Sequence, residues 1–279
     1  MRSIHRHGRP VAGGPHPLIC IRLLGRTRDA LLGELAIALA KKPDIIEWRV
    51  DCFAALGDTA QVIDVAAQIR SISGKTPIIF TCRSMDEGGE RIALDDTDVM
   101  KLYVAACASR CIDLIDYELS NSAENLARLR NASRDNEVAM IMSYHNVVAT
   151  PDPERLTAIF LDAERLGADI AKVAVTAAGP DDVLTLLDAT SRASKLCAIP
   201  LIALSTGDFA SFSHLIAWVC GSTVAFAFGL KSRTPVELSI DDLRVALASL
   251  QQTRRADGAA PAACQPGAGA TLNQHLTPA

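Results

Sequence analysis

Three residues able to form and process an imine lie in or just after strand-like parts of this chain. Lys172 is in the middle of the apolar run 169–175, whose β-branched residues are typical of a buried strand. Lysine is rarely buried without a partner, and loss of solvent disfavours its charged form, so a neutral amine able to attack a ketone is expected. A lysine at a strand end with its head in solvent is the alternative for this run taken alone.

His145 and Glu87 supply the groups that an imine reaction needs next. His145 follows the apolar run 139–144, and Glu87 follows the run 77–83. An iminium acts as an electron sink that acidifies the neighbouring carbon, and an imidazole one strand away can remove that proton. The carboxylate of Glu87 could hold the imidazole in the required tautomer. A core histidine and an exposed turn carboxylate are the ordinary alternatives, but their occurrence together with Lys172 favours a catalytic set that requires no metal.

Further charged residues lie at the ends of the second and third strand-like runs. Glu47 and Arg49 alternate within Glu-Trp-Arg, and Arg83 closes the following run. Taken alone, Glu47 and Arg49 fit a structural ion pair. If they lie near Lys172, Arg49 and Arg83 are expected to favour the uncharged form of its amine by like-charge repulsion. They are also expected to bind an anionic or hydroxylated substrate.

The elements that must position these residues alternate regularly between residues 17 and 252. The strand-like runs cover residues 18–23, 45–51, 77–83, 114–119, 139–144, 169–175, 200–205 and 223–228. Amphipathic helix-like runs cover residues 29–41, 59–71, 95–108, 123–131, 153–166, 180–194, 211–220 and 240–251. Eight such units joined by right-handed crossovers close most simply into a barrel, whose active site lies at the carboxyl ends of the strands.

The sequence therefore predicts an α/β fold, a single (β/α)8 TIM barrel over residues 17–253. A doubly wound open sheet is the competing architecture, but no GxGxxG motif follows the first strand-like run. Residues 1–16 and 254–279 are rich in Gly, Pro, Ala and polar residues, and we expect both to be disordered tails.

Composition narrows the class of partner. The chain has 279 residues, of which 49% are apolar and 22% charged, and its net charge is −4. Without a basic face or a run of eighteen apolar residues, neither nucleic acid nor a membrane is an expected partner. The eight cysteines are scattered without a CxxC pair, which favours reduced core thiols in a cytoplasmic protein.

Taken together, these motifs resemble the type I 3-dehydroquinate dehydratases, Schiff-base enzymes of the shikimate pathway. The matching segments are residues 46–51, 80–83, 87–90, 116–119, 140–146 and 169–175, within a resemblance that spans about residues 17–251. Tyr117 departs from the aliphatic residue usual at its position. The resemblance implies a small polyhydroxylated keto acid as substrate, no cofactor, and a homodimer.

The resemblance also implies a role for each residue. Lys172 would form the imine with the ketone of 3-dehydroquinate. His145 would take the adjacent proton and then protonate the departing hydroxyl, giving 3-dehydroshikimate, while Glu87 orients it. Glu47, Arg49 and Arg83 would contact the ring hydroxyls of the substrate. Phe226 would line the cavity.

The last third of the chain departs from the family pattern at the substrate-recognising positions. His214 stands where the family has the arginine that binds the substrate carboxylate, and Arg233 and Glu237 replace a serine and a glutamine of the lid. One interpretation is compensation, in which Arg233 replaces the missing clamp. The others are a paralogue that uses the same imine chemistry on a different keto substrate, and a non-catalytic metabolite-sensing or interaction barrel.

Overall fold

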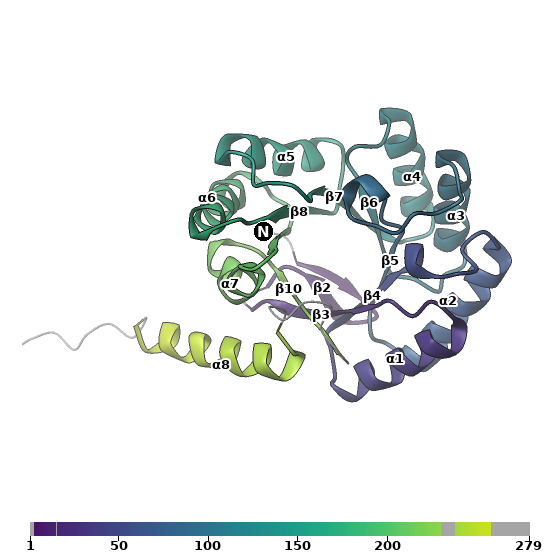
Figure 1. Cartoon of the computed structure of the whole chain (residues 1–279), viewed down its shortest axis with the longest axis horizontal. Coiled ribbons are helices and arrows are strands. Elements are labelled where there is room, and N and C mark those ends of the chain that lie inside the picture. Colours follow the sequence, from purple (N-terminus) through teal and green to yellow (C-terminus); the bar gives the residue numbers. More distant parts are fainter. Residues whose placement is uncertain (1–2, 15, 230–237, 258–279) are drawn as a thin grey trace, which may run out of the picture.

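Eight parallel strands with helices between them form a barrel in the computed structural model of this protein, which describes residues 3–14, 16–229 and 238–257 (Figure 1). The strands are β3 (Leu18–Leu23), β4 (Ile45–Arg49), β5 (Ile78–Thr81), β6 (Leu114–Glu118), β7 (Ala139–Asn146), β8 (Ile170–Thr176), β9 (Leu201–Thr206) and β10 (Val224–Ala227). They follow the order β10-β3-β4-β5-β6-β7-β8-β9, and a bridge from Leu201 to Ser222 joins the two ends. The predicted (β/α)8 TIM barrel is confirmed.

Helices surround the strands. They are α1 (Arg28–Ala40), α2 (Thr59–Ser73), α3 (Asp96–Ala108), α4 (Ala123–Asp135), α5 (Pro153–Arg165), α6 (Pro180–Leu196), α7 (Ala210–Ile216) and α8 (Ile240–Asp257). Short 3-10 turns η1 (Val50–Cys52), η2 (Met85–Glu87) and η3 (Ala217–Cys220) occur after β4, β5 and α7. Several helices begin at a side chain that accepts a hydrogen bond from the first turn, as Asp58 does for α2 and Ser122 for α4. None of the helices described is both long enough and apolar enough to cross a membrane.

The two-residue period of the strands divides the barrel into an inner and an outer set of side chains. On β8, Ala171 and Val173 belong to the core between strands and helices, whereas Ile170 and Ala174 belong to the core inside the barrel. Lys172 therefore points inward with Ile170 and Ala174. In each strand, every second side chain therefore points into the interior of the barrel.

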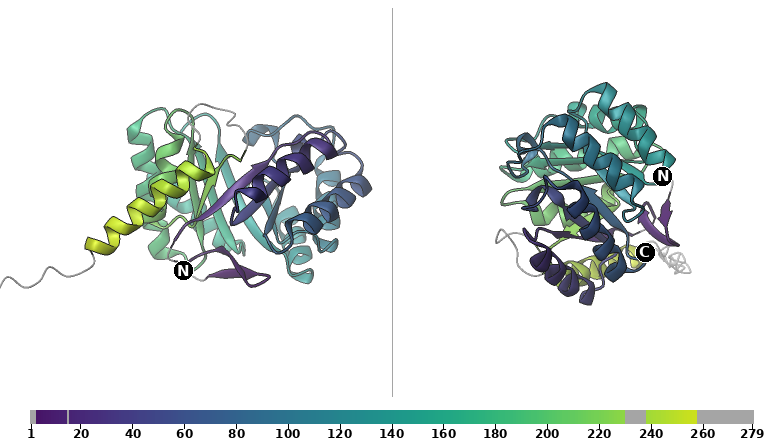
Figure 2. Two further views of the ribbon diagram at one scale, coloured as in Figure 1. Left: turned by 90° about the horizontal axis from the view of Figure 1, so that it is seen from below. Right: turned by 90° about the vertical axis from the view of Figure 1, so that its right-hand side faces the viewer.

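An antiparallel hairpin, β1 (Ile4–Arg6) and β2 (Arg9–Ala12), covers the amino-terminal end of the barrel (Figure 2). Its turn residues His7 and Gly8 both have positive φ, as tight hairpins require. Val11 and Ala12 are buried against the inner core. The prediction of a disordered tail over residues 1–16 is wrong for residues 4–12, because this segment closes an end of the barrel that would otherwise expose apolar side chains.

The carboxyl-terminal helix is longer than expected. Helix α8 continues to Asp257, so residues 254–257 are helical rather than part of the predicted tail. The hydroxyl of Ser239 accepts a hydrogen bond from the backbone N of Asp242 at 3.1 Å and caps this helix. Residues 258–279 and the predicted lid residues Arg233 and Glu237 lie outside the described residues.

Candidate active site

A cavity of about 150 Å³ opens at the carboxyl ends of the barrel strands. Seven of the ten residues predicted to form the site line it: Glu47, Arg49, Arg83, Glu87, His145, Lys172 and Phe226. They come from four strands, β4, β7, β8 and β10, and from the segment that follows β5. The alternating inward positions of the strands therefore bring together residues that lie up to 179 positions apart in the sequence.

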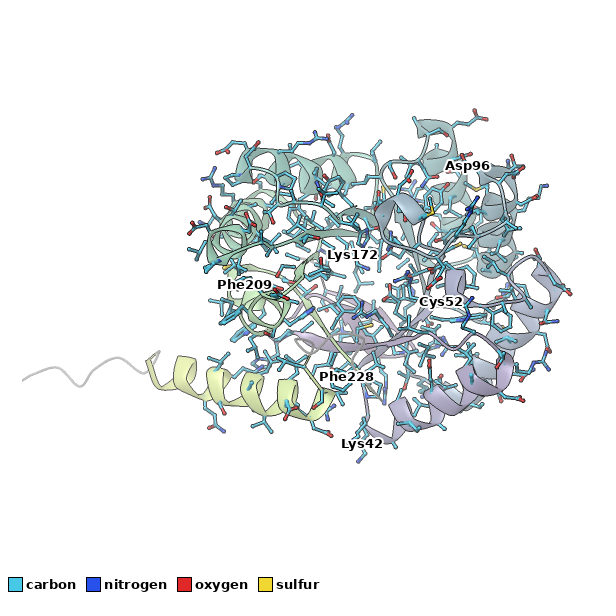
Figure 3. The ribbon with its side chains drawn as sticks, in the orientation of Figure 1. Lys42, Cys52, Asp96, Lys172, Phe209 and Phe228 are labelled. Atoms are coloured by element: carbon cyan, nitrogen blue, oxygen red, sulfur yellow. The ribbon has the colours of Figure 1, made fainter. Side chains whose placement is uncertain are left out.

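Lys172 lies in the interior of the barrel, with a side chain that is only 5% exposed (Figure 3). Its Nζ is 2.7 Å from Oδ2 of Asp116 and 3.5 Å from Oε1 of Glu47. It also lies 5.1 Å from the centre of the Phe226 ring. This position excludes the alternative of a strand-end lysine whose head is in solvent.

Asp116, on β6, connects Lys172 to a second buried cation. Its Oδ1 accepts hydrogen bonds from Nη2 of Arg83 at 2.8 Å and from the Ser143 hydroxyl at 2.6 Å. Burial acts to raise the pKa of Asp116, but Arg83 and Lys172 outweigh it and hold that pKa well below its usual range. Asp116 is therefore an ionised anchor for the amine. Asp116 lies in the segment 116–119 that resembles the family, but no role was expected for it from the sequence.

The two arginines of the predicted set are themselves held by carboxylates. Arg49 makes a two-point contact with Asp51, at 2.8 and 2.7 Å. Arg83 donates to Glu118 at 2.9 Å as well as to Asp116. Each arginine therefore has a carboxylate within 2.9 Å, which offsets part of the positive charge that was expected to repel Lys172.

His145 and Glu87 form the pair that the sequence suggested. Nδ1 of His145 is 2.9 Å from Oε2 of Glu87, and the backbone N of His145 donates to the same oxygen at 3.0 Å. The Ser120 hydroxyl donates to the other oxygen of Glu87 at 2.9 Å. These contacts fix the carboxylate on both sides and fix the imidazole ring relative to it.

The environment sets the protonation of this pair. Burial, followed by the positive charges of Arg83 and Lys172, lowers the pKa of His145 well below its ordinary value. Burial and then repulsion from Glu118 raise the pKa of Glu87 to about 7. At neutral pH the imidazole is therefore uncharged, which is the form that can accept a proton.

His214 takes a different place from the one expected. It lies on α7, where its Nδ1 accepts a hydrogen bond from the backbone N of Phe226 at 3.4 Å, and it is not among the residues that line the cavity. Its ring is 6.5 Å from that of Phe226. The structure therefore does not bring His214 together with the other predicted site residues, and its contact with substrate stays a prediction.

Arg22 was not predicted, yet it lines the cavity. It lies on β3 opposite Glu47 of β4, and its guanidinium carbon is 6.0 Å from the centre of the Phe226 ring. The signal for it was present in the sequence, since Arg22 is two residues after the inward-facing Cys20.

This arrangement has the parts that imine chemistry requires. A buried amine and an uncharged imidazole line one small cavity, and a carboxylate orients the imidazole. An imine on Lys172 would place the adjacent carbon of the substrate within the same enclosed space as the imidazole. The arrangement can therefore support proton abstraction next to an iminium, followed by loss of a leaving group.

Comparisons with known proteins agree with this arrangement. The sequence profile of the family described as type I 3-dehydroquinase matches residues 19–254. A 3-dehydroquinate dehydratase from Albidiferax ferrireducens is 48% identical over 251 residues, which cover 90% of this chain and 95% of that protein.

Solved structures give the same result. The 3-dehydroquinate dehydratase from Geobacillus kaustophilus superposes with a TM-score of 0.87 at 41% identity, covering 90% of this chain and 97% of that one. The type I 3-dehydroquinate dehydratase from Clostridium difficile, solved with covalently modified comenic acid, has a TM-score of 0.87 at 29% identity, covering 90% and 99%. The chain belongs to the type I 3-dehydroquinate dehydratase family.

Proposed function

We propose that this chain removes water from 3-dehydroquinate to give 3-dehydroshikimate through a Schiff base on Lys172. The observation that carries the proposal is that the buried amine of Lys172 and the imidazole of His145 line one cavity. The 48% identity to a named 3-dehydroquinate dehydratase supports this reaction over a paralogue with another substrate and over a non-catalytic barrel.

The amine of Lys172 adds to the ketone carbon, and the resulting carbinolamine loses water to form an iminium. Electron withdrawal by the iminium acidifies the neighbouring carbon, and the uncharged imidazole of His145 takes a proton from it to give an enamine. The enamine expels the hydroxyl on the ring carbon next to the deprotonated carbon, two carbons from the one bound to Lys172. The imidazolium returns its proton to the oxygen of that hydroxyl. Hydrolysis of the new iminium frees the amine and the product, so that the net change is the loss of one water.

Glu87 orients the base in this scheme. With its carboxylate accepting from Nδ1–H of His145, the lone pair of the imidazole is on Nε2. The same carboxylate stabilises the imidazolium that forms when the proton is transferred. Because burial raises the pKa of Glu87 to about 7, this support is complete only above that pH.

The remaining predicted residues form the walls of the cavity. Glu47 accepts a hydrogen bond from the Thr81 hydroxyl at 2.9 Å and lies 3.5 Å from Lys172. We assign to Glu47, Arg49 and Arg83 the contacts with the substrate hydroxyls, since each lines the cavity and is fixed in place by its partners. A cytoplasmic location and a homodimer complete the proposal.

The experiment that tests this function is steady-state turnover of 3-dehydroquinate, followed by the absorbance of the conjugated enone product. We expect the native chain to convert the substrate and Lys172→Met to abolish conversion. Lys195→Met is the matched control, because Lys195 is exposed on α6, and its activity should equal that of the native chain. Conversion by Lys172→Met at the native rate would overturn the assignment of the amine.

A further inference from the structure

The segment after β5, residues 83–90, carries Glu87 to His145, and one buried carboxylate accepts hydrogen bonds from both of its ends. We propose that Asp51 is a positioning residue that closes this segment, called here the Glu87 loop, and so fixes Glu87 on the general base. This inference rests on the proposed dehydration, in which His145 is the base and Glu87 orients it. Asp51 thereby has a part in the reaction beyond its contact with Arg49.

Asp51 lies in the turn η1 that follows β4, and its side chain is 0% exposed. Its two oxygens accept four hydrogen bonds from nitrogen donors. Oδ1 accepts from Nε of Arg49 at 2.8 Å and from the backbone N of Arg83 at 3.2 Å. Oδ2 accepts from Nη2 of Arg49 at 2.7 Å and from the backbone N of Glu90 at 3.1 Å. Each oxygen therefore joins the guanidinium to one end of the Glu87 loop.

The charge of Asp51 suits this task. Burial acts to raise its pKa, but the hydrogen bonds and charge of Arg49 and the two backbone N–H groups outweigh burial and hold that pKa below its ordinary value. Asp51 is therefore ionised at neutral pH. A carboxylate can accept at all four positions, whereas the amide of asparagine would turn its own N–H donors toward two of these N–H groups. The closure of the loop thus depends on the carboxylate.

The Glu87 loop is also built so that its ends meet. The backbone N of Gly89 donates to the carbonyl oxygen of Ser84 at 2.7 Å. A Cβ at Gly89 would lie 2.0 Å from the carbonyl oxygen of Arg83, so the two ends cross at a distance that only glycine allows. Glu118 holds the first end as well, by accepting from the backbone N of Ser84 at 2.8 Å, whereas Asp51 accepts from both ends. The loop is therefore a ring that Asp51 closes.

This ring determines where the Glu87 carboxylate lies. Its Oε2 is 2.9 Å from Nδ1 of His145 and accepts from the backbone N of His145 at 3.0 Å. An open ring would let the carboxylate move away from the imidazole, and a misplacement of about 1 Å can cost about 10²-fold in rate. Lys172 lies on β8 and is held by Asp116 at 2.7 Å, so its amine does not depend on the loop. Opening the ring should therefore slow the proton transfer and leave imine formation intact.

Two double-mutant cycles test whether Asp51 acts through Glu87. In the first, kcat for 3-dehydroquinate is measured for the native chain, Asp51→Asn, Glu87→Ala and the double variant, and the imine is trapped in each with borohydride and weighed. In the second, Gly89→Ala takes the place of Asp51→Asn, because it opens the ring without removing a charge. Gly33→Ala is the matched control, since a Cβ at this position in α1 would meet nothing within 4 Å.

We expect Asp51→Asn and Gly89→Ala each to lower kcat by about 10²-fold in the native background, with the imine still trapped. In the Glu87→Ala background there is no carboxylate left to position. The kcat of each double variant should therefore lie within about twofold of that of Glu87→Ala, which is the usual error of such cycles. Gly33→Ala should match the native chain.

Several results would overturn the proposal. If Asp51→Asn lowers kcat as much in Glu87→Ala as in the native chain, Asp51 acts through Arg49 or through the fold as a whole. Native kcat in Asp51→Asn, or loss of the trapped imine, would count equally against it. If Asp51→Asn does not fold, judged by circular dichroism, the Gly89→Ala cycle decides by the same criteria.

Failure of this inference can be told apart from failure of the proposed function. No turnover of 3-dehydroquinate by the native chain would overturn both together. An active native chain in which the effects of the two substitutions multiply would overturn only the role of Asp51.

Discussion

Replacing Glu87 by glutamine should stabilise the fold at alkaline pH while it weakens catalysis. Glu87 has a side chain that is only 7% exposed, and burial followed by repulsion from Glu118 raises its pKa from 4.5 to about 7. The folded chain therefore binds this proton more tightly than the unfolded chain does. The stability that the protonated Glu87 carboxyl contributes is complete below about pH 4.5 and is lost as pH rises toward about 7.

The size of the effect follows from those two values. A gap from 4.5 to about 7, at about 1.4 kcal/mol for each pKa unit, corresponds to about 3 kcal/mol of free energy of unfolding. Glutamine has nearly the same shape, carries no charge and can still accept from the backbone N of His145. The stability of Glu87→Gln relative to the native chain should therefore rise by up to about 3 kcal/mol between pH 4.5 and pH 8.5.

Urea unfolding of both proteins at several pH values measures this difference directly. The other titrating groups are the same in both proteins, so their contributions to the pH dependence of stability cancel in the difference. Glu124→Gln, at an exposed position in α4, is the control and should show no such change with pH. In the same series, kcat/KM of the native chain should rise through about pH 7, and Glu87→Gln should lack that rise. A stability difference that stays constant with pH, or that moves in favour of the native chain, would refute the reasoning.

Two further substitutions test the division of roles in the site. His145→Ala should still form the imine but lower kcat by about 10²- to 10⁴-fold, because the proton is then left without its base; single-turnover trapping with borohydride checks this, and loss of the imine itself would count against it. Asp116→Asn should lower the free energy of unfolding by about 3 kcal/mol or more, since Lys172 and Arg83 lose a buried carboxylate. Urea unfolding measures this change, with the surface variant Asp188→Asn as control, and equal midpoints for the two variants would contradict it.

The sequence was sufficient for the barrel because its signals repeat. Each predicted strand-like run overlaps one observed strand, and residues 18–23 coincide with β3. The two-residue period then determines which side chains point inward, and it placed Glu47, His145 and Lys172 in one cavity. A repeated pattern constrains a fold strongly because every unit must agree with its neighbours.

The hairpin at the amino terminus could not be recognised from local patterns. Residues 4–12 have the composition of a tail, and only two of them, Val11 and Ala12, are buried. What orders the segment is tertiary: the inner core of the barrel needs a cover, and the imidazole of His7 lies 2.8 Å from the buried carboxylate of Asp113. Neither contact is visible in the sequence around the hairpin.

The site was predicted better for its chemistry than for its partners. Lys172, His145 and Glu87 were identified by residue type. The pairing of Asp116 with Lys172 and the place of Arg22 in the cavity were not predicted, because contacts across strands depend on distances. His214 shows the converse. Alignment with a family position suggested a substrate contact, whereas the side chain supports the backbone of Phe226.

Chemical trapping of the intermediate tests the central claim most directly. The native chain is mixed with 3-dehydroquinate, reduced with borohydride and weighed intact, and the modified residue is located by peptide mass spectrometry. We expect one stable adduct per chain, on Lys172, and none in Lys172→Met. Turnover without any adduct, or an adduct on a different lysine, would contradict it.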